Sequence, residues 1–382
     1  MKLALMLGGT DEGRSGIGRY VRELAPRLLT LLQQEGDSLC AIGTRAEHDA
    51  YAQELTGAEQ VIVSARWQSP GPNALWHLIA SSGAAAAAGC DVALFPAANR
   101  RMALRSPLPL VAVVHDLAQL RVKGKYDRAR MSYVEHVLLP SLRRANSLVA
   151  VSSATRADVE AYVTTKPDAT RVVPNGVDYQ RFVPKEHCVT AIERARTQLE
   201  LSGPYLLYLS RLELPAKNHL RLIEAFAASS ARESHTLVLA GGDWGGRAAI
   251  EATIDRLHVR DRVRLLGFVD DELVPALVAG AEVVAMVGLF EGFGLPALEA
   301  LSCGVPVVVS NTGALPEVVG TLGLLADPTS VLALREALER ALGDEAHRRR
   351  VLVEGPKWAR AHGWEASATA LLDTCRAAAR AA

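Results

Sequence analysis

The stretch Gly288-Leu-Phe-Glu-Gly-Phe-Gly-Leu-Pro-Ala-Leu-Glu299 decides how the chain is expected to fold. It follows the apolar run of residues 283–287, which predicts a buried strand, and its Pro296 suits the first turn of a helix because the φ of proline is fixed. Gly292 and Gly294 allow a tight bend and a close approach to a ligand. Amides at the start of such a helix point toward negative charge, so the stretch predicts a phosphate site between a strand and a helix.

Two acidic residues, Glu291 and Glu299, bracket this loop with seven residues between them. Carboxylates accept hydrogen bonds from hydroxyl groups. Backbone amides that bind phosphate, beside carboxylates that bind hydroxyls, would together fit a sugar nucleotide. The alternative is a plain helix N-terminus, with one acid placed to suit the helix dipole and the other on a solvated face. This stretch alone leaves both interpretations open.

Length and composition limit the class of protein. A chain of 382 residues is long for one core, so two or three domains are expected. Apolar residues make up 49% of the chain, and Val, Ile and Leu runs between Ala-rich stretches predict an α/β class. The 42 Lys and Arg residues balance 42 Asp and Glu residues, which argues against a nucleic-acid partner because such binding draws on a basic excess.

Cysteine use and hydropathy predict the compartment. The five cysteines are scattered and show no paired spacing, so we expect a reducing environment and neither a disulfide framework nor a zinc site. No apolar stretch approaches the ~20 residues that cross a bilayer. The apolar run after Lys2 is short for a secretory signal and predicts a first strand. A cytoplasmic protein is therefore expected.

The first half of the chain alternates predicted strands with helical stretches, which implies parallel pairing and ligands at the carboxyl ends of the strands. Strands are expected at residues 2–7, 38–42, 60–63, 91–95, 110–114 and 147–151. Residues 8–20 form a glycine-rich loop that enters an amphipathic helix, which fits either an anion site or a tight turn. His115 ends one strand and fits either a structural histidine or a cleft residue. Asp116 is expected to fix that loop or the histidine, with activation of an acceptor as the alternative.

The second half begins after the turn signal Pro174-Asn-Gly176, which marks a domain boundary. Strands are expected at residues 205–209, 236–240, 263–266, 283–287 and 305–309, and helices at 331–342, 346–353 and 364–379. Arg211 and Lys217 follow the first of these strands, where two cations can converge on a diphosphate. Two ordinary surface cations are the alternative.

Short motifs occur in a fixed order along nearly the whole chain. They are the glycine loop 8–20, Val113-Val-His-Asp-Leu117, Asn175-Gly-Val-Asp178, Arg211 with Lys217, Gly267-Phe-Val269, and Glu291 with Glu299. This ordered set resembles the retaining glycosyltransferases of the family 4 type. The resemblance implies an α/β protein of GT-B architecture, with two Rossmann-like domains whose parallel sheets face a deep interdomain cleft. It further implies an acceptor-binding domain over residues 1–180, joined by a C-terminal helix of about 363–382, and a nucleotide-sugar-binding domain over 181–362.

The resemblance also implies roles for individual residues. Arg211 and Lys217 would stabilise the leaving diphosphate, Glu291 and the loop amides would hold the sugar and phosphate, Glu299 the ribose, and His115 the sugar. The residues expected to act in catalysis are His115, Arg211, Lys217 and Glu291. Those expected to bind the donor are Gly16, Arg211, Lys217, Phe268, Val269, Glu291, Gly292, Phe293, Gly294, Leu295 and Glu299. Those expected on the acceptor side are Ser15, Gly16, Arg19, Tyr20 and Asp116.

This chain departs from the family pattern at two places. Ser15 in the first glycine loop and Ser210 before Arg211 each stand where glycine is usual in the family. No Asp-x-Asp triplet is present, so no required metal is expected. The resemblance implies no other cofactor. No pair of carboxylates with nucleophile and acid roles is recognisable, which favours front-face attack over a covalent intermediate.

Substrates are expected only as classes. The donor is a nucleotide-diphosphate sugar, with GDP-mannose as the first expectation and a UDP-sugar as the next, and the acceptor is a glycan, a lipid-linked molecule or a small molecule. The basic segment 121–130 fits a solvated surface run or a peripheral contact with anionic lipid at the inner face of the membrane. Two other functions stay open: a sugar-nucleotide epimerase of the same two-domain plan, and a non-catalytic sugar-nucleotide binding protein.

Overall fold

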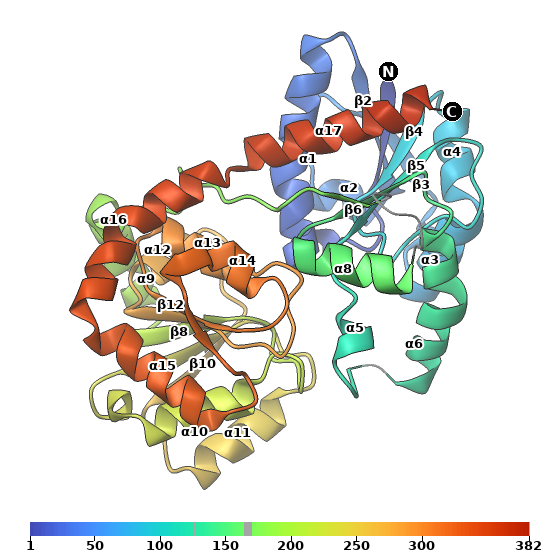
Figure 1. The fold of residues 1–382 in the computed structure, drawn as a ribbon. Helices are drawn as coiled ribbons and strands as arrows, with labels where there is room; N and C mark the ends of the chain where they lie inside the picture. Colours follow the sequence, from blue (N-terminus) through green and yellow to red (C-terminus); the bar gives the residue numbers. More distant parts are fainter. Residues whose placement is uncertain (126, 164–169, 382) are drawn as a thin grey trace. The chain divides into compact units, whose positions relative to one another are not determined.

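The computed structural model describes residues 1–125, 127–163 and 170–381, and it divides into two compact units (Figure 1). Unit 1 comprises Met1–Leu117, Tyr126–Asn175 and Trp364–Ala382, and unit 2 comprises Ala118–Lys125 and Gly176–Gly363. Each unit carries its own parallel sheet with helices on its faces. The predicted fold class, α/β with two Rossmann-like domains, is confirmed.

Unit 1 is built on a seven-stranded parallel sheet in the order β3-β2-β1-β4-β5-β6-β7. Its strands are β1 (Lys2–Met6), β2 (Ser38–Thr44), β3 (Glu59–Val63), β4 (Val92–Phe95), β5 (Leu110–Val114), β6 (Ser147–Ala150) and β7 (Thr170–Val172). Its helices are α1 (Gly16–Gln34), α2 (Arg45–Ala50), α3 (Pro70–Ile79), α4 (Ser81–Ala87), α6 (Arg128–Tyr133), α7 (Leu139–Leu142), α8 (Ser153–Tyr162) and α17 (Trp364–Arg380). A π-helical turn at Val134–Leu138 joins α6 to α7. Every residue of β4 and β5 is buried, as expected for parallel strands covered on both faces.

Unit 2 is built on a six-stranded parallel sheet in the order β10-β9-β8-β11-β12-β13. Its strands are β8 (Tyr205–Leu209), β9 (Thr236–Ala240), β10 (Val263–Gly267), β11 (Val283–Met286), β12 (Val307–Ser310) and β13 (Leu324–Ala326). Its helices are α5 (Ala118–Arg121), α9 (Val189–Gln198), α10 (His219–Ala228), α11 (Arg247–Arg256), α12 (Val274–Ala279), α13 (Leu295–Ser302), α14 (Leu315–Val319), α15 (Val331–Gly343) and α16 (Glu345–Ala361).

The strand order fixes where each unit can bind a ligand. In unit 2 the chain moves outward from β8 to β9 and β10, then returns to place β11 on the other side of β8. The loops after β8 and β11 therefore leave the sheet toward opposite faces, and ligands in such sheets bind beyond the strand ends at this switch point. Unit 1 has the same switch between β1 and β4.

The last helix, α17, belongs to unit 1 although it is the end of the chain. It packs on α1 (Figure 1). Trp364 at its start is only 1% exposed, and its ring is edge-on to that of Tyr20 at 5.9 Å. The Ser367 hydroxyl donates to the Pro174 carbonyl at 2.6 Å, which ties α17 to the segment after β7. The first and last segments of the chain thus share one core.

Candidate active site

In unit 2, the loops after β8 and β11 meet at the switch point of the sheet. The two strands are direct neighbours, with Leu206 and Leu207 opposite Val283 and Val284. The amide of Leu289 donates to the carbonyl of Ala216 at 2.8 Å. This backbone contact brings Lys217 on one loop beside Glu291 on the other.

Lys217 and Glu291 form a close ion pair. The Nζ of Lys217 lies 2.9 Å from each of the two carboxylate oxygens of Glu291, and their side chains are 19% and 11% exposed. Tyr208 on β8 donates its hydroxyl to the Lys217 carbonyl at 2.6 Å. Burial raises the pKa of Tyr208, and the negative charge of Glu291 adds to this shift. The phenol therefore stays a hydrogen-bond donor that fixes the backbone under Lys217.

Two glycines allow the Glu291 loop to lie against its neighbours. A Cβ at Gly288 would lie 2.5 Å from Oε1 of Glu291, and one at Gly313 would lie 2.5 Å from the Glu291 carbonyl oxygen. Gly313 also has φ +63°, a value that favours glycine. The amide of Ala314 donates to the Glu291 carbonyl at 2.9 Å. The loop is thus held on both sides.

Helix α13 starts where the glycine loop ends, as the sequence predicts. Gly294 has φ +100°, and Pro296 occupies the second position of α13. The amides of Phe293, Gly294 and Leu295 donate no hydrogen bond within the part of the chain that the structure describes, and so can serve a ligand. Glu299 is only 5% exposed, so the alternative of a second acid on a solvated face is wrong.

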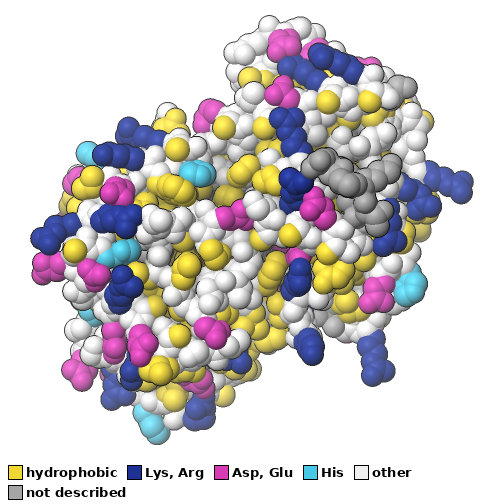
Figure 2. Space-filling view, viewed as in Figure 1, with side chains coloured by type: hydrophobic (Ala, Val, Ile, Leu, Met, Phe, Trp, Pro, Cys, Tyr) yellow, Lys and Arg dark blue, Asp and Glu magenta, His cyan; other side chains and the backbone are white. Residues whose placement is uncertain are grey.

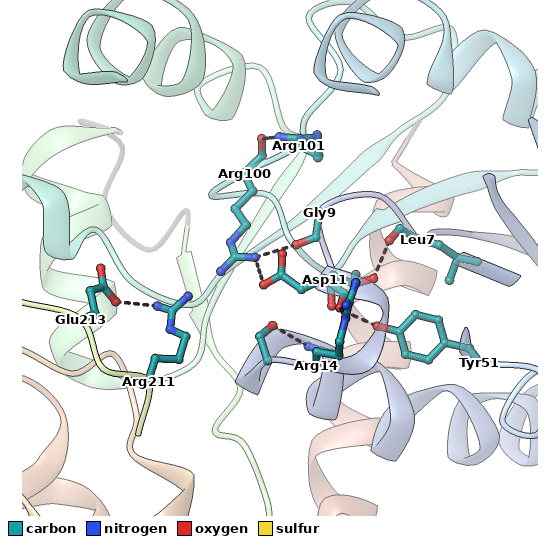
Figure 3. A network of polar contacts seen from close by, with 12 residues as sticks. Leu7, Gly9, Asp11, Arg14, Tyr51, Arg100, Arg101, Arg211 and Glu213 are labelled. Carbon is teal, nitrogen blue, oxygen red and sulfur yellow. Dashed lines mark hydrogen bonds and ion pairs between the residues drawn. The ribbon is translucent and has the colours of Figure 1, made fainter. Parts of the chain in front are cut away.

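Arg211 is held by two neighbours in the loops of unit 2. Its Nη2 donates to Oε2 of Glu213 at 2.8 Å (Figure 3), and its guanidinium carbon lies 4.2 Å from the ring centroid of Trp244. Sequence reasoning missed both partners. Trp244 stands in the glycine-rich loop after β9, and a tryptophan among so many glycines is the sequence signal that could have pointed to it.

The two residues expected near a nucleotide base follow β10. Phe268 is 64% exposed, whereas Val269 is 7% exposed. The Phe268 side chain is therefore open to solvent, and a role through the backbone at these residues stays a prediction.

In unit 1, His115 lies at the end of β5 and is 8% exposed. Its Nε2 pairs with the Pro96 carbonyl at 2.7 Å, and its ring is edge-on to Tyr20 at 4.8 Å. Burial lowers the pKa of His115 to about 4, so the ring is neutral near pH 7. Because a carbonyl only accepts, Nε2 carries the proton and Nδ1 is left as an acceptor for a hydroxyl.

The glycine loop of unit 1 is ordered by the N-terminus of α1. The Ser15 hydroxyl accepts from the Gly18 amide at 3.3 Å, and the Arg19 amide donates to the Ser15 carbonyl at 2.8 Å. A Cβ at Gly18 would lie 2.5 Å from Cα of Gly13, whereas nothing lies within 4 Å of one at Gly16. Gly18 is thus required by packing, and the space beside Gly16 is open.

Other residues expected on the acceptor side differ in exposure. Tyr20 is 1% exposed and packs between His115 and Trp364, so in this structure it supports those rings. Arg19 and Asp116 are half-buried. The negative charge of Asp116 opposes the lowering of the His115 pKa by burial.

Arg100, which follows β4, contacts the glycine loop of unit 1 (Figure 3). Arg100 donates to the Gly9 carbonyl at 3.1 Å and pairs with Asp11. Tyr51 adds a hydrogen bond from its hydroxyl to the Thr10 carbonyl at 3.2 Å. Sequence reasoning missed Arg100, because no motif marks it apart from its place after a strand.

Three features of the structure bear on metal binding, membrane contact and surface charge. Within residues 1–125, 127–163 and 170–381, no helix is both long and apolar enough to cross a bilayer, and no group of three or more His, Cys, Asp or Glu residues could hold a metal ion. On the face seen in Figure 2, Lys and Arg side chains are interspersed with Asp and Glu. Of the basic segment 121–130, Tyr126 lies outside the described residues, and Arg128 and Arg130 are exposed. Lipid contact, cytoplasmic location and independence from metal stay predictions.

Two family models match the chain. The model described as Glycosyltransferase Family 4 matches residues 14–181, and the model described as Glycosyl transferases group 1 matches residues 189–358. The first match covers residues 14–20 of the glycine loop and His115, and the second covers Arg211, Lys217 and Glu291.

Curated relatives and solved structures agree with these matches. The chain is 33% identical over 259 residues to O-antigen chain mannosyltransferase B of Escherichia coli, covering 67% of each chain. It is 33% identical over 227 residues to an MMP alpha-(1->4)-mannosyltransferase of Mycolicibacterium hassiacum, covering 55% of this chain and 51% of that protein. The sucrose-phosphate synthase of Thermosynechococcus elongatus shares the fold over 100% of both chains, with a TM-score of 0.78 and 22% identity. Anabaena HepE, solved with UDP-glucose, covers 99% of this chain with a TM-score of 0.74 and 20% identity.

Proposed function

Since this chain belongs to the family 4 glycosyltransferases, we propose that it transfers a hexose from a nucleotide-diphosphate sugar to a glycan, lipid-linked or small-molecule acceptor. The transfer retains the anomeric configuration and needs no metal. GDP-mannose is the first candidate donor, because two relatives at 33% identity are named mannosyltransferases. A UDP-sugar is the second, since a protein of the same fold was solved with UDP-glucose.

One observation carries this proposal: the ion pair of Lys217 and Glu291 at the switch point of unit 2. Each partner offers what the donor would need, because the ammonium group can bind phosphate and the carboxylate can accept hydrogen bonds from hydroxyls. In this structure the Lys217 ammonium and the Glu291 carboxylate satisfy each other at 2.9 Å. A bound sugar nucleotide would replace this pairing with phosphate on Lys217 and sugar hydroxyls on Glu291.

The residues around this pair suit the bond changes of transfer. The bond between the anomeric carbon and the terminal phosphate oxygen breaks, the acceptor oxygen attacks from the same face, and its proton passes to the leaving phosphate. Arg211 and Lys217 stabilise the negative charge that develops on that phosphate. The amides of Phe293, Gly294 and Leu295 add dipoles that need no rearrangement during the reaction.

Glu299 and His115 complete the assignment of roles. Glu299 is 5% exposed, and a ribose hydroxyl would donate to its carboxylate. His115 is neutral because burial lowers its pKa to about 4, and its Nδ1 accepts a hydrogen bond from a hydroxyl of the transferred sugar. The glycine loop, with Ser15, Gly16 and Arg19, faces the acceptor in this proposal.

The test is a transfer assay with GDP-mannose and UDP-glucose, with and without a panel of glycan and lipid-linked acceptors. Release of nucleoside diphosphate that depends on the acceptor, and the α-anomer in the product by NMR, support the proposal. If the donor alone yields isomerised sugar, the protein is an epimerase and not a transferase. If the donor binds without any turnover, the protein is a non-catalytic binding protein.

Variants make this assay specific to the site. Lys217→Ala and Arg211→Ala should each lower kcat at least about 100-fold, as expected on loss of a group that stabilises transition-state charge. Lys357→Ala is the matched control, because Lys357 is an exposed lysine on α16 of unit 2. Full activity in Lys217→Ala would overturn the assignment of the site, and loss of activity in EDTA would overturn independence from metal.

A further inference from the structure

The Arg211 side chain is restrained by two contacts within unit 2. One edge of its guanidinium is taken by Glu213 at 2.8 Å, and one face lies 4.2 Å from the centre of the Trp244 ring. Among the described residues, Nε and Nη1 of Arg211 have no hydrogen-bond partner, and the side chain is 28% exposed. The restrained guanidinium therefore keeps free N–H groups in a fixed plane.

The backbone under Trp244 is fixed without help from its indole. The Trp244 amide donates to the Leu212 carbonyl at 3.2 Å, and the Leu212 amide donates to the Gly242 carbonyl at 2.9 Å. The carboxylate of Asp243 accepts from the amides of Gly245 and Gly246 at 2.9 and 3.1 Å. Removing the indole should therefore leave the loop in place.

The indole itself gains little from burial, because Trp244 is 56% exposed. Burial alone therefore does not explain a large aromatic side chain at this position of the loop. The contact of the indole with the Arg211 guanidinium supplies a reason, since an arginine loses less conformational freedom on binding when its planar group is already held.

From these contacts we propose that Trp244 is a positioning residue: its indole holds Arg211 so that the free N–H groups meet the terminal phosphate of a nucleoside diphosphate. This inference rests on the proposed function and deepens it, because it names a residue that sets affinity for the second phosphate. Trp244 acts through Arg211 and does not itself stack on the base.

Calorimetric titration of the full-length protein with GDP, GMP, UDP and UMP tests this assignment. Trp244→Ala should raise the Kd of the preferred nucleoside diphosphate about tenfold, a loss of about 1.4 kcal/mol. The Kd of the matching monophosphate should change less than about twofold. Trp244→Phe should retain most of the diphosphate affinity that Trp244→Ala loses, because the guanidinium can still stack on a smaller aromatic ring.

Two controls exclude general effects. Trp67→Ala removes another tryptophan that lies against an arginine, with Arg66 at 5.0 Å from its ring, but in unit 1 and outside the proposed donor site. It should leave all four titrations unchanged. In an Arg211→Ala background, Trp244→Ala should cause no further loss, because the group that it positions is gone.

The outcomes separate this inference from the proposed function. If the parent protein binds a nucleoside diphosphate and Trp244→Ala binds it equally well, the inference is wrong and the proposed function stands. Equal losses for diphosphate and monophosphate would mean that the indole contacts the nucleoside, which also overturns the inference. If the parent binds none of the four nucleotides, the proposed GDP-linked and UDP-linked donors are wrong, and the positioning role fails with them.

Discussion

At the residue scale, Lys217 and Glu291 depend on each other because both are mostly buried, with side chains 19% and 11% exposed. Removing the ammonium group leaves a carboxylate in a poorly hydrated place without its partner. We expect Lys217→Ala to lower the free energy of unfolding by about 2–3 kcal/mol. Denaturant titration at pH 7 measures this change.

A second substitution distinguishes the lost charge pair from lost packing. In the Lys217→Ala background, Glu291→Gln should recover part of the stability, because a neutral amide is easier to keep buried than an unpaired carboxylate. Lys357→Ala, in an exposed lysine, should change the unfolding free energy by less than about 0.5 kcal/mol. No recovery in the double variant would mean that the ion pair is not what stabilises these loops.

His115 predicts a pH dependence of stability. Burial lowers its pKa in the folded state to about 4, from an ordinary value of 6.5, so between these pH values the unfolded chain binds more protons. Stability from this group is complete above about pH 6.5 and falls as the pH decreases toward 4, by about 3 kcal/mol in total. Titration of the ring by NMR should show the lowered pKa, and His115→Gln should flatten the slope of unfolding free energy against pH. A ring that titrates near 6.5 would contradict this account.

The sequence predicted the positions of the charged site residues better than it predicted which of them pair. Arg211, Lys217 and Glu291 follow strands at fixed spacings, so their place beyond the strand ends followed from the pattern. Glu299 was expected inside the helix that starts near Pro296, and it lies in α13. The pairing of Lys217 with Glu291 did not follow, because it depends on β8 and β11 being neighbours across 74 residues of chain. Trp244 and Arg100 were missed because their contacts also depend on strands that are neighbours in a sheet: β9 lies beside β8, and β4 beside β1.

At the element scale, the loop between β11 and α13 depends on glycines that accommodate its backbone. Gly313 has φ +63°, and a Cβ there would lie 2.5 Å from the Glu291 carbonyl oxygen. Gly203 has φ +79° in the same unit, but nothing lies within 4 Å of its Cβ position. Gly203→Ala should therefore cost about 1 kcal/mol of stability through backbone strain alone.

The comparison of the two glycines isolates the contact with Glu291. Gly313→Ala should cost about 2 kcal/mol more than Gly203→Ala, because the new methyl group must displace backbone. It should also weaken nucleotide binding, whereas Gly203→Ala should not. Unfolding curves and nucleotide titrations of both variants measure these effects, and equal behaviour of the two variants would show that the close contact is unimportant.

Most elements could be predicted because their patterns are long and regular. The all-buried strands β5 and β11 are continuous apolar runs, and the predicted helix start near Pro296 is confirmed. The sequence prediction did not include β7 and β13, which have only three residues each and lie at the sheet edges, too short for a pattern to show. The strand expected from residue 305 begins at Val307, since Pro306 has no amide to donate.

At the scale of the whole molecule, the core of unit 1 needs the last helix of the chain. Trp364 is 1% exposed and contacts the Tyr20 ring of α1, so the core formed by the first residues is completed only by α17. Trp364→Ala should lower the stability of unit 1 by about 3–5 kcal/mol through the cavity that it leaves. Thermal unfolding measures this loss, with the half-buried Trp67 as the control. A loss as small as that of Trp67→Ala would show that α17 is not part of the core.

Thermal unfolding with GDP, UDP, ADP and dTDP shows whether unit 2 holds a nucleoside diphosphate between the loops after β8 and β11. A nucleotide at about 100 times its Kd should stabilise the parent protein by about 2.7 kcal/mol. Lys217→Ala and Glu299→Gln should lose most of that gain, while Lys357→Ala keeps it. If no nucleotide stabilises the parent, or if the site variants respond as the parent does, the donor site proposed here is wrong.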